Sequence, residues 1–165
     1  MTSASNTSAS NTSATDDPAG LPSSGRHTAD GHLLPIRIYF EDTDFSGVVY
    51  HASYVRFLER GRTEYVRLLG VHHAALDAGE TGESIAFAVH RLEIEFRRPA
   101  RIDDVVEVVT RPKEIRGARI ILSQQVRRGA ELLVDATVTV VLVNRAGRPC
   151  RIPDSLAERF AAAPQ

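Results

Sequence analysis

The chain has 165 residues and a formal net charge of −1, and this length allows one self-sufficient domain with a tail. The near-zero charge gives no general attraction to nucleic acid or to an anionic membrane, so neither is expected as a partner. The single cysteine, Cys150, excludes an internal disulfide and any metal site built from several cysteines.

Residues 1–32 differ in composition from the rest of the chain. The sequence Thr-Ser-Ala-Ser-Asn at residues 2–6 recurs at residues 7–11, and the segment has no aromatic and no β-branched apolar residue. It cannot bury enough surface to offset the entropy lost on ordering, so we expect a disordered extension at residues 1–32 and one folded domain at residues 33–165. A partner-binding arm is the functional alternative. The sequence shows no secretory signal and no apolar run long enough to span a membrane, which favours a cytoplasmic protein.

The folded domain is predicted to begin with a strand at residues 34–40, where apolar and polar side chains alternate. A helix follows over residues 53–69, because apolar residues recur there at helical spacing on one face. Ser53 is the expected N-cap, and Gly70 lies just beyond the expected end. Gly61 costs helical stability, so we expect another backbone to cross the helix closely there. A polar set covers the opposite face: Arg56, Glu59, Arg60, Arg62, Thr63, Glu64 and Arg67.

After a loop over about residues 71–84, four further strands are expected, at about residues 85–97, 104–115, 118–127 and 132–144. The apolar side chains of the first of them change phase near His90, which predicts a bulge. Gly117 and Gly129 mark tight turns. The late strands should therefore form an antiparallel meander, with the long helix packed across one face.

A short helix over residues 153–162, anchored by Phe160, closes the predicted chain. These elements indicate an α+β fold. One long helix cannot cover a sheet of about five strands, so uncovered apolar surface predicts association. The simplest assembly is a homodimer with the sheet continued across the two-fold axis, and a dimer of dimers is the next possibility.

A polar motif joins the first strand to the long helix, and it places carboxylates just before a helix N-terminus. Residues 39–51 read Tyr-Phe-Glu-Asp-Thr-Asp-Phe-Ser-Gly-Val-Val-Tyr-His, and residues 52–64 continue Ala-Ser-Tyr-Val-Arg-Phe-Leu-Glu-Arg-Gly-Arg-Thr-Glu. This run resembles the hotdog-fold acyl-CoA thioesterases, and more narrowly the 4-hydroxybenzoyl-CoA thioesterase family and its Tol–Pal-associated branch. The likeness covers about residues 35–155. It implies a hotdog fold, with the antiparallel sheet wrapped around one long helix. It also implies hydrolysis of an acyl-CoA thioester, with no cofactor apart from the coenzyme A of the substrate.

Asp44 and His51 are the catalytic residues that the resemblance implies. The family's carboxylate falls on Asp44, either as a nucleophile or as a general base that activates water. Without the motif, a turn cap would be the better interpretation of Asp44. By resemblance, the backbone N–H of His51 polarises the thioester carbonyl, and its side chain would orient Asp44 or water. Many members of the branch carry tyrosine where this chain has Phe40, which offers no hydroxyl.

The expected substrate-binding residues are Gly47, Tyr50, Glu59, Arg98 and Arg116. The arginines suit the phosphates of coenzyme A, although a solvated surface position is the alternative for each. Asp42 is expected to stabilise the turn rather than to react. No metal is predicted, because the acids and histidines have no helical His pair and no paired cysteine motif.

Two other classes of function stay open on sequence alone. A hotdog hydratase or dehydratase would need an acid–base pair flanking the α and β carbons of the acyl group, and the motif does not resemble those families. A non-catalytic acyl-CoA-binding or scaffold protein would bind without turnover. A thiol-release assay over acyl-CoAs of graded length distinguishes these classes.

Overall fold

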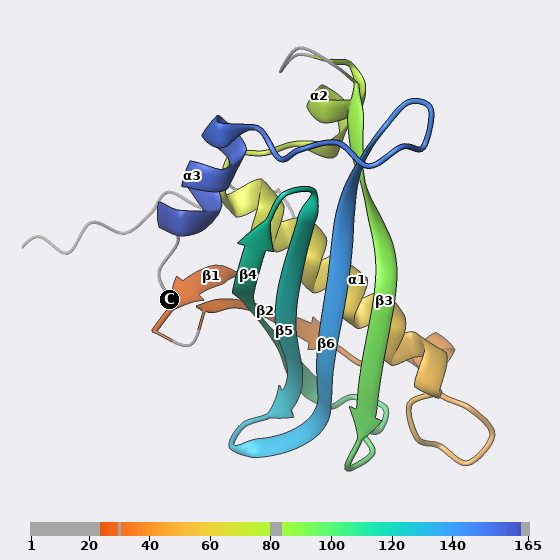
Figure 1. Ribbon diagram of the computed structural model, residues 1–165. Helices are drawn as coiled ribbons and strands as arrows, with labels where there is room; N and C mark the ends of the chain where they lie inside the picture. Colours follow the sequence, from red (N-terminus) through yellow and green to blue (C-terminus); the bar gives the residue numbers. More distant parts are fainter. Residues whose placement is uncertain (1–23, 30, 80–83, 163–165) are drawn as a thin grey trace, which may run out of the picture.

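The computed structural model describes residues 24–29, 31–79 and 84–162. Its elements, including the short 3₁₀ turn η1, are β1 (Arg26–Thr28), β2 (Gly31–Arg37), η1 (Phe40–Asp42), α1 (His51–Leu68), α2 (His73–Asp77), β3 (Ile85–Phe96), β4 (Val105–Arg116), β5 (Arg119–Arg128), β6 (Glu131–Asn144) and α3 (Asp154–Ala162). Figure 1 shows α1 crossing one face of the sheet diagonally. The short helices α2 and α3 lie toward the end of the sheet away from the start of α1.

The strands form one antiparallel sheet in the order β1-β2-β4-β5-β6-β3. β4, β5 and β6 form the predicted meander, but β3 stands apart from it and pairs with β6 at the sheet edge. The physical reason lies in the crossover, which we define as residues 97–104. Ala100 is fully buried there, and its carbonyl accepts the N–H of Val49 (2.9 Å). Because the crossover packs against the start of α1, it does not turn β3 tightly into β4.

The folded chain begins earlier than predicted. β1 pairs with β2, so the boundary placed after residue 32 lies inside a β-hairpin. His32 is 0% exposed, and its ring lies 5.8 Å from that of Tyr65 and 6.2 Å from that of His27. The segment is polar in composition, but a neutral imidazole can be buried against an aromatic ring. Residues 1–23 of the predicted extension lie outside the described residues.

α1 packs on the sheet through the apolar face that its periodicity predicted. Its buried residues include Tyr54, Phe57, Leu58, Gly61 and Tyr65. The close approach expected at Gly61 is present, although it involves a side chain rather than a backbone. A Cβ atom at Gly61 would lie 2.6 Å from Cγ1 of Val108 on β4.

Arg62 does not lie on the exposed face, where the sequence pattern placed it, and is only 7% exposed. Its guanidinium pairs with Glu59 and donates to Oε1 of Gln124 (2.8 Å). Gln124 in turn donates to the carbonyl of Leu58 and to the hydroxyl of Thr110 (2.9 Å each). A buried arginine needs such partners, and Gln124 lies 62 residues further along the chain, so local periodicity could not reveal it.

α1 starts two residues earlier than predicted. Its N-cap is Tyr50. Ser53, the expected cap, is buried in the first turn, where its hydroxyl donates to the carbonyl of Asp42 (3.0 Å). The predicted end is confirmed, since Gly70 follows the helix with a φ of +74°. The bulge predicted near His90 is also present in β3.

Burial lowers the pKa of His32, and the neighbouring His27 acts in the same direction. Because the lowered pKa means that the folded state disfavours the charged imidazole, the unfolded state binds more protons near and below about pH 6.5. The free energy of unfolding should therefore fall as the pH drops below that value. We expect a His32→Gln variant to lose less stability than the wild type between about pH 7.5 and about pH 5, as measured by urea unfolding. Equal losses in the two proteins would contradict this account.

Candidate active site

A short segment that includes η1 connects β2 to α1, and Asp42 stabilises its turn. The Asp42 carboxylate accepts the N–H of Tyr39 (3.0 Å) and lies 3.7 Å from the guanidinium of Arg56. Its backbone carbonyl accepts the N–H of Tyr50 (2.9 Å). Asp42 is buried and engaged on both sides, so it holds the turn, as predicted.

Asp44 lies on the loop that follows η1, and its carboxylate is partly exposed. Oδ1 accepts hydrogen bonds from the hydroxyl and from the backbone N–H of Ser46, the latter at 2.8 Å. These two hydrogen bonds, first that of the hydroxyl, lower the pKa of the Asp44 carboxyl. Oδ2 accepts no hydrogen bond from the described residues. Asp44 thus caps its own turn and also presents an ionised carboxylate with one open oxygen.

Backbone hydrogen bonds give this loop a defined shape. The N–H of Asp44 donates to the carbonyl of Val48 (3.0 Å), and the N–H of Gly47 donates to the carbonyl of Asp44 (3.0 Å). Gly47 has a φ of +75°, a conformation that glycine adopts without a steric cost. Gly47 therefore shapes the turn of the loop that carries Asp44.

His51 is the first residue of α1. The N-cap Tyr50 makes no side-chain hydrogen bond to the helix, and the first N–H groups of a helix have no acceptor within it. The N–H groups of His51 and Ala52 therefore point out of the helix end, where the helix dipole is positive. The His51 ring lies 4.4 Å from the ring of Tyr50 and 6.4 Å from that of Phe96, measured between centroids.

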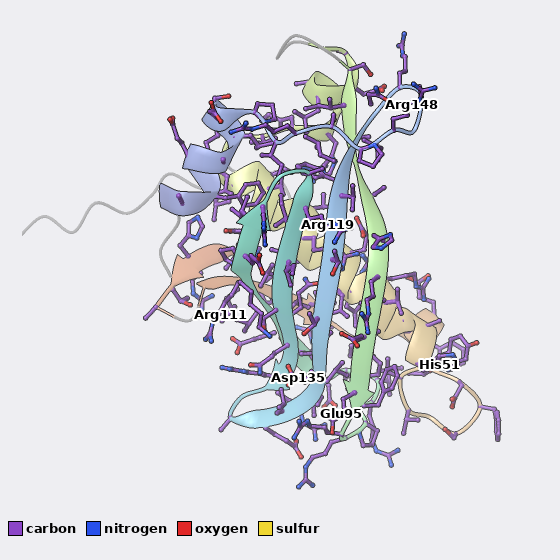
Figure 2. The ribbon with its side chains drawn as sticks, in the orientation of Figure 1. His51, Glu95, Arg111, Arg119, Asp135 and Arg148 are labelled. Carbon is purple, nitrogen blue, oxygen red and sulfur yellow. The ribbon has the colours of Figure 1, made fainter. Side chains whose placement is uncertain are left out.

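A pocket of about 280 Å³ opens beside His51. It is lined by Val49, His51, Tyr54, Phe96, Arg97, Arg98 and Pro99. Figure 2 shows His51 at the start of α1, beside the end of β3. Arg98 and His51 thus line the same pocket. The guanidinium of Arg98 lies 3.4 Å from the carboxylate of Glu131. Another hollow, toward the β5–β6 turn, shares Phe96, Arg97 and Arg98 with this pocket.

Two predicted residues lie away from this pocket within one chain. Arg116 ends β4, and a strand of 12 residues extends over roughly 36 Å. Figure 1 shows the β4–β5 turn at the end of the sheet opposite the start of α1. Glu59 lines a second cavity, between α1 and the sheet, together with Arg62, Thr63 and Phe87.

Tyr54, on the buried face of α1, was not among the residues predicted for the site. It lines the His51 pocket, and its hydroxyl accepts the N–H of Ala100 (2.9 Å). The sequence feature that could have indicated this role is the residue type itself. A buried tyrosine, unlike a phenylalanine, usually needs a hydrogen-bond partner for its hydroxyl.

Among the described residues, no three histidine, cysteine or acidic side chains are grouped as metal ligands would be. No helix of the described segments combines the length and the apolar character needed to cross a membrane.

Known proteins are similar to this chain in sequence and in fold. Residues 38–160 match the family model described as the thioesterase-like superfamily. The chain belongs to this superfamily. The acyl-CoA thioester hydrolase YbgC of Escherichia coli O6:H1 is 40% identical over 128 residues, which cover 76% of this chain and 92% of the relative. The acyl-CoA thioesterase YbgC of Haemophilus influenzae is 38% identical over 132 residues, covering 79% and 95%. A solved structure of a probable thioesterase from Bartonella henselae has 44% identity and a TM-score of 0.72, covering 74% of this chain and 98% of its own.

These matches confirm the predicted hotdog fold and the predicted resemblance to hotdog-fold acyl-CoA thioesterases, and they show that the chain is similar to the YbgC thioesterases. They also confirm that the chain is an enzyme that hydrolyses acyl-CoA thioesters. Association with a Tol–Pal system stays a prediction, and so do the roles of the individual site residues.

Proposed function

We propose that this thioesterase hydrolyses acyl-CoA substrates in the pocket beside His51, with Asp44 as the reacting carboxylate. One juxtaposition carries the proposal. An ionised carboxylate with an open oxygen lies on a loop that leads directly into helix N–H groups without helical acceptors. The carboxylate acts at the carbonyl carbon, while the N–H groups stabilise the negative charge that develops on the carbonyl oxygen.

Two routes use this arrangement. In the first, an Asp44 oxygen attacks the thioester carbon, the carbon–sulfur bond breaks and the coenzyme A thiolate leaves. Water then hydrolyses the resulting anhydride to the free acid. In the second, Asp44 takes a proton from a water molecule that attacks the same carbon, and the thiolate leaves directly. An ordinary thiol has a pKa of about 8.5, so the leaving group requires no strong acid on either route.

We infer that His51 contributes mainly through its backbone. Its ring lies near those of Tyr50 and Phe96, as aromatic packing would place it. Its N–H, in contrast, has no acceptor within α1. The hydrogen-bond donor for the carbonyl oxygen is therefore the backbone N–H at the first position of α1, and not the imidazole.

We also infer that a second copy of the chain completes the site. β3 forms an edge of the sheet, and Val89 and Phe96 on it are 49% and 50% exposed. An open edge pairs readily with another strand, and two β3 strands joined antiparallel about a two-fold axis would continue the sheet. Phe96, beside His51, would then lie opposite the first half of the partner β3, next to the cavity that the partner copy of Glu59 lines.

In this homodimer, a substrate-binding candidate that lies far from the His51 pocket of its own chain would lie closer to that of the partner. The end of the sheet that carries Arg116 in one copy would approach the His51 pocket of the other copy. Arg98 and the partner copy of Arg116 could then bind coenzyme A phosphates from two sides. A dimer of dimers and a cytoplasmic location stay predictions.

Replacing Asp44 with asparagine tests the proposed mechanism. The amide neither attacks a carbonyl nor accepts a proton from water, so thiol release from acyl-CoAs of graded length should fall by roughly 10²–10⁴-fold. Glu41→Gln is the matched control, because Glu41 is an exposed acid of the same turn and should retain activity. Undiminished hydrolysis by Asp44→Asn would exclude the mechanism. Acyl-CoA binding without turnover by the wild type would favour the binding-protein alternative.

Removing the Ser46 hydroxyl tests whether the Asp44 carboxylate is the group that must be ionised. The Ser46 hydroxyl contributes most to the lowered pKa of Asp44, so Ser46→Ala should raise that pKa toward its ordinary value. The acid limb of the pH profile of kcat/KM should therefore move to higher pH, while activity near pH 8 stays unchanged. An acid limb that does not move would show that another group controls the reaction.

A further inference from the structure

Tyr54 connects the first turn of α1 to the crossover. It is 3% exposed, and burial raises the pKa of its phenol, so the hydroxyl stays neutral. The hydroxyl oxygen accepts the N–H of Ala100 (2.9 Å). The ring lies 5.9 Å from that of Phe57 and 5.9 Å from that of Phe96, measured between centroids. Packing and a hydrogen bond therefore both hold this side chain in place.

The connection continues from the crossover to both halves of the site. The carbonyl of Ala100 accepts the N–H of Val49 (2.9 Å), two residues before His51. The neighbouring Arg101 forms an antiparallel bridge with Val48. Val48 in turn accepts the N–H of Asp44 (3.0 Å). Tyr54 is thus linked through two crossover residues to the backbone that carries Asp44 and to the backbone that enters α1.

We propose that Tyr54 is a positioning residue of the thioesterase site. Its hydroxyl holds Ala100, and through Ala100 it sets the separation between the Asp44 carboxylate and the N–H of His51. The proposal rests on the function proposed above for these two residues. Tyr54 acts here through Ala100 and Val49, so its hydroxyl needs no contact with the reacting atoms. An error of about 1 Å in such a separation can reduce turnover by roughly 100-fold.

The same helix offers a matched control. Tyr65 also lies on the buried face of α1 and is 1% exposed, but its hydroxyl has no hydrogen-bond partner among the described residues. Tyr54→Phe and Tyr65→Phe delete the same atom from the same helix. Only Tyr54→Phe leaves a buried backbone N–H, that of Ala100, without its acceptor.

The experiment compares kcat and KM for the two variants and the wild type, well below their unfolding temperatures. For Tyr54→Phe we expect kcat to fall about 10- to 100-fold, with KM changed less than about two-fold, because the reacting groups are misplaced while binding contacts remain. For Tyr65→Phe we expect both constants to stay within about two-fold of the wild type. Equal kcat values in the two variants would overturn the proposal, since a purely structural tyrosine would lower stability without changing turnover of the folded enzyme.

Hydrogen exchange in the wild type supplies a second reading, in case Tyr54→Phe does not fold. The proposal requires the Ala100 amide to be protected although it lies in a connection outside the strands, and exchange at the rate of an exposed loop would overturn it. Failure of the proposed function would look different, because the wild type itself would then release no thiol from any acyl-CoA.

Discussion

The chain that enters α1 is held by backbone hydrogen bonds to two other parts of the fold, while the first N–H groups of the helix have no acceptor within it. Asp42 accepts the N–H of Tyr50, and Ala100 accepts the N–H of Val49. With both donors engaged, the segment before His51 has a fixed path into the helix. A helix N–H that opens on a pocket can be solvated, whereas a buried unpaired N–H would cost about 1–3 kcal/mol.

The sheet keeps that helix start in place. Gly61 lies so close to Val108 that a methyl group would not fit between them, and Gln124 links the helix carbonyl of Leu58 to the guanidinium of Arg62. These contacts lie roughly 15 Å along the helix from its first residue. Breaking a buried polar pair costs far more than breaking a surface pair, so they fix the rotation and position of α1 on the sheet.

Local patterns were enough to predict the long helix, the main strands and the last helix, and the motif was enough to predict the family. They did not predict β1 or α2, which lie in segments expected to be disordered or a loop. The helical period around Phe57 and the phase change near His90 each depend on neighbours in sequence, so both could be read directly. The burial of Arg62 depends on a glutamine from a distant strand, and the place of β3 depends on a crossover whose Ala100 packs against α1. The sequence shows a tyrosine at position 54, but it does not show that the hydroxyl of Tyr54 accepts the N–H of Ala100. The start of α1 was predicted two residues too late for a similar reason. Ser53 donates to the carbonyl of Asp42, outside the helix, and does not cap its own helix.

We expect the thioester to lie between the Asp44 loop and the first N–H of α1. A crystal structure of the Asp44→Asn variant with a bound acyl-CoA tests this placement. The thioester carbonyl oxygen should lie about 2.7–3.1 Å from the backbone nitrogen of His51, and the side chain of residue 44 about 3–3.5 Å from the carbonyl carbon or one water away. A thioester bound with its carbonyl away from the start of α1 would exclude the proposed oxyanion site.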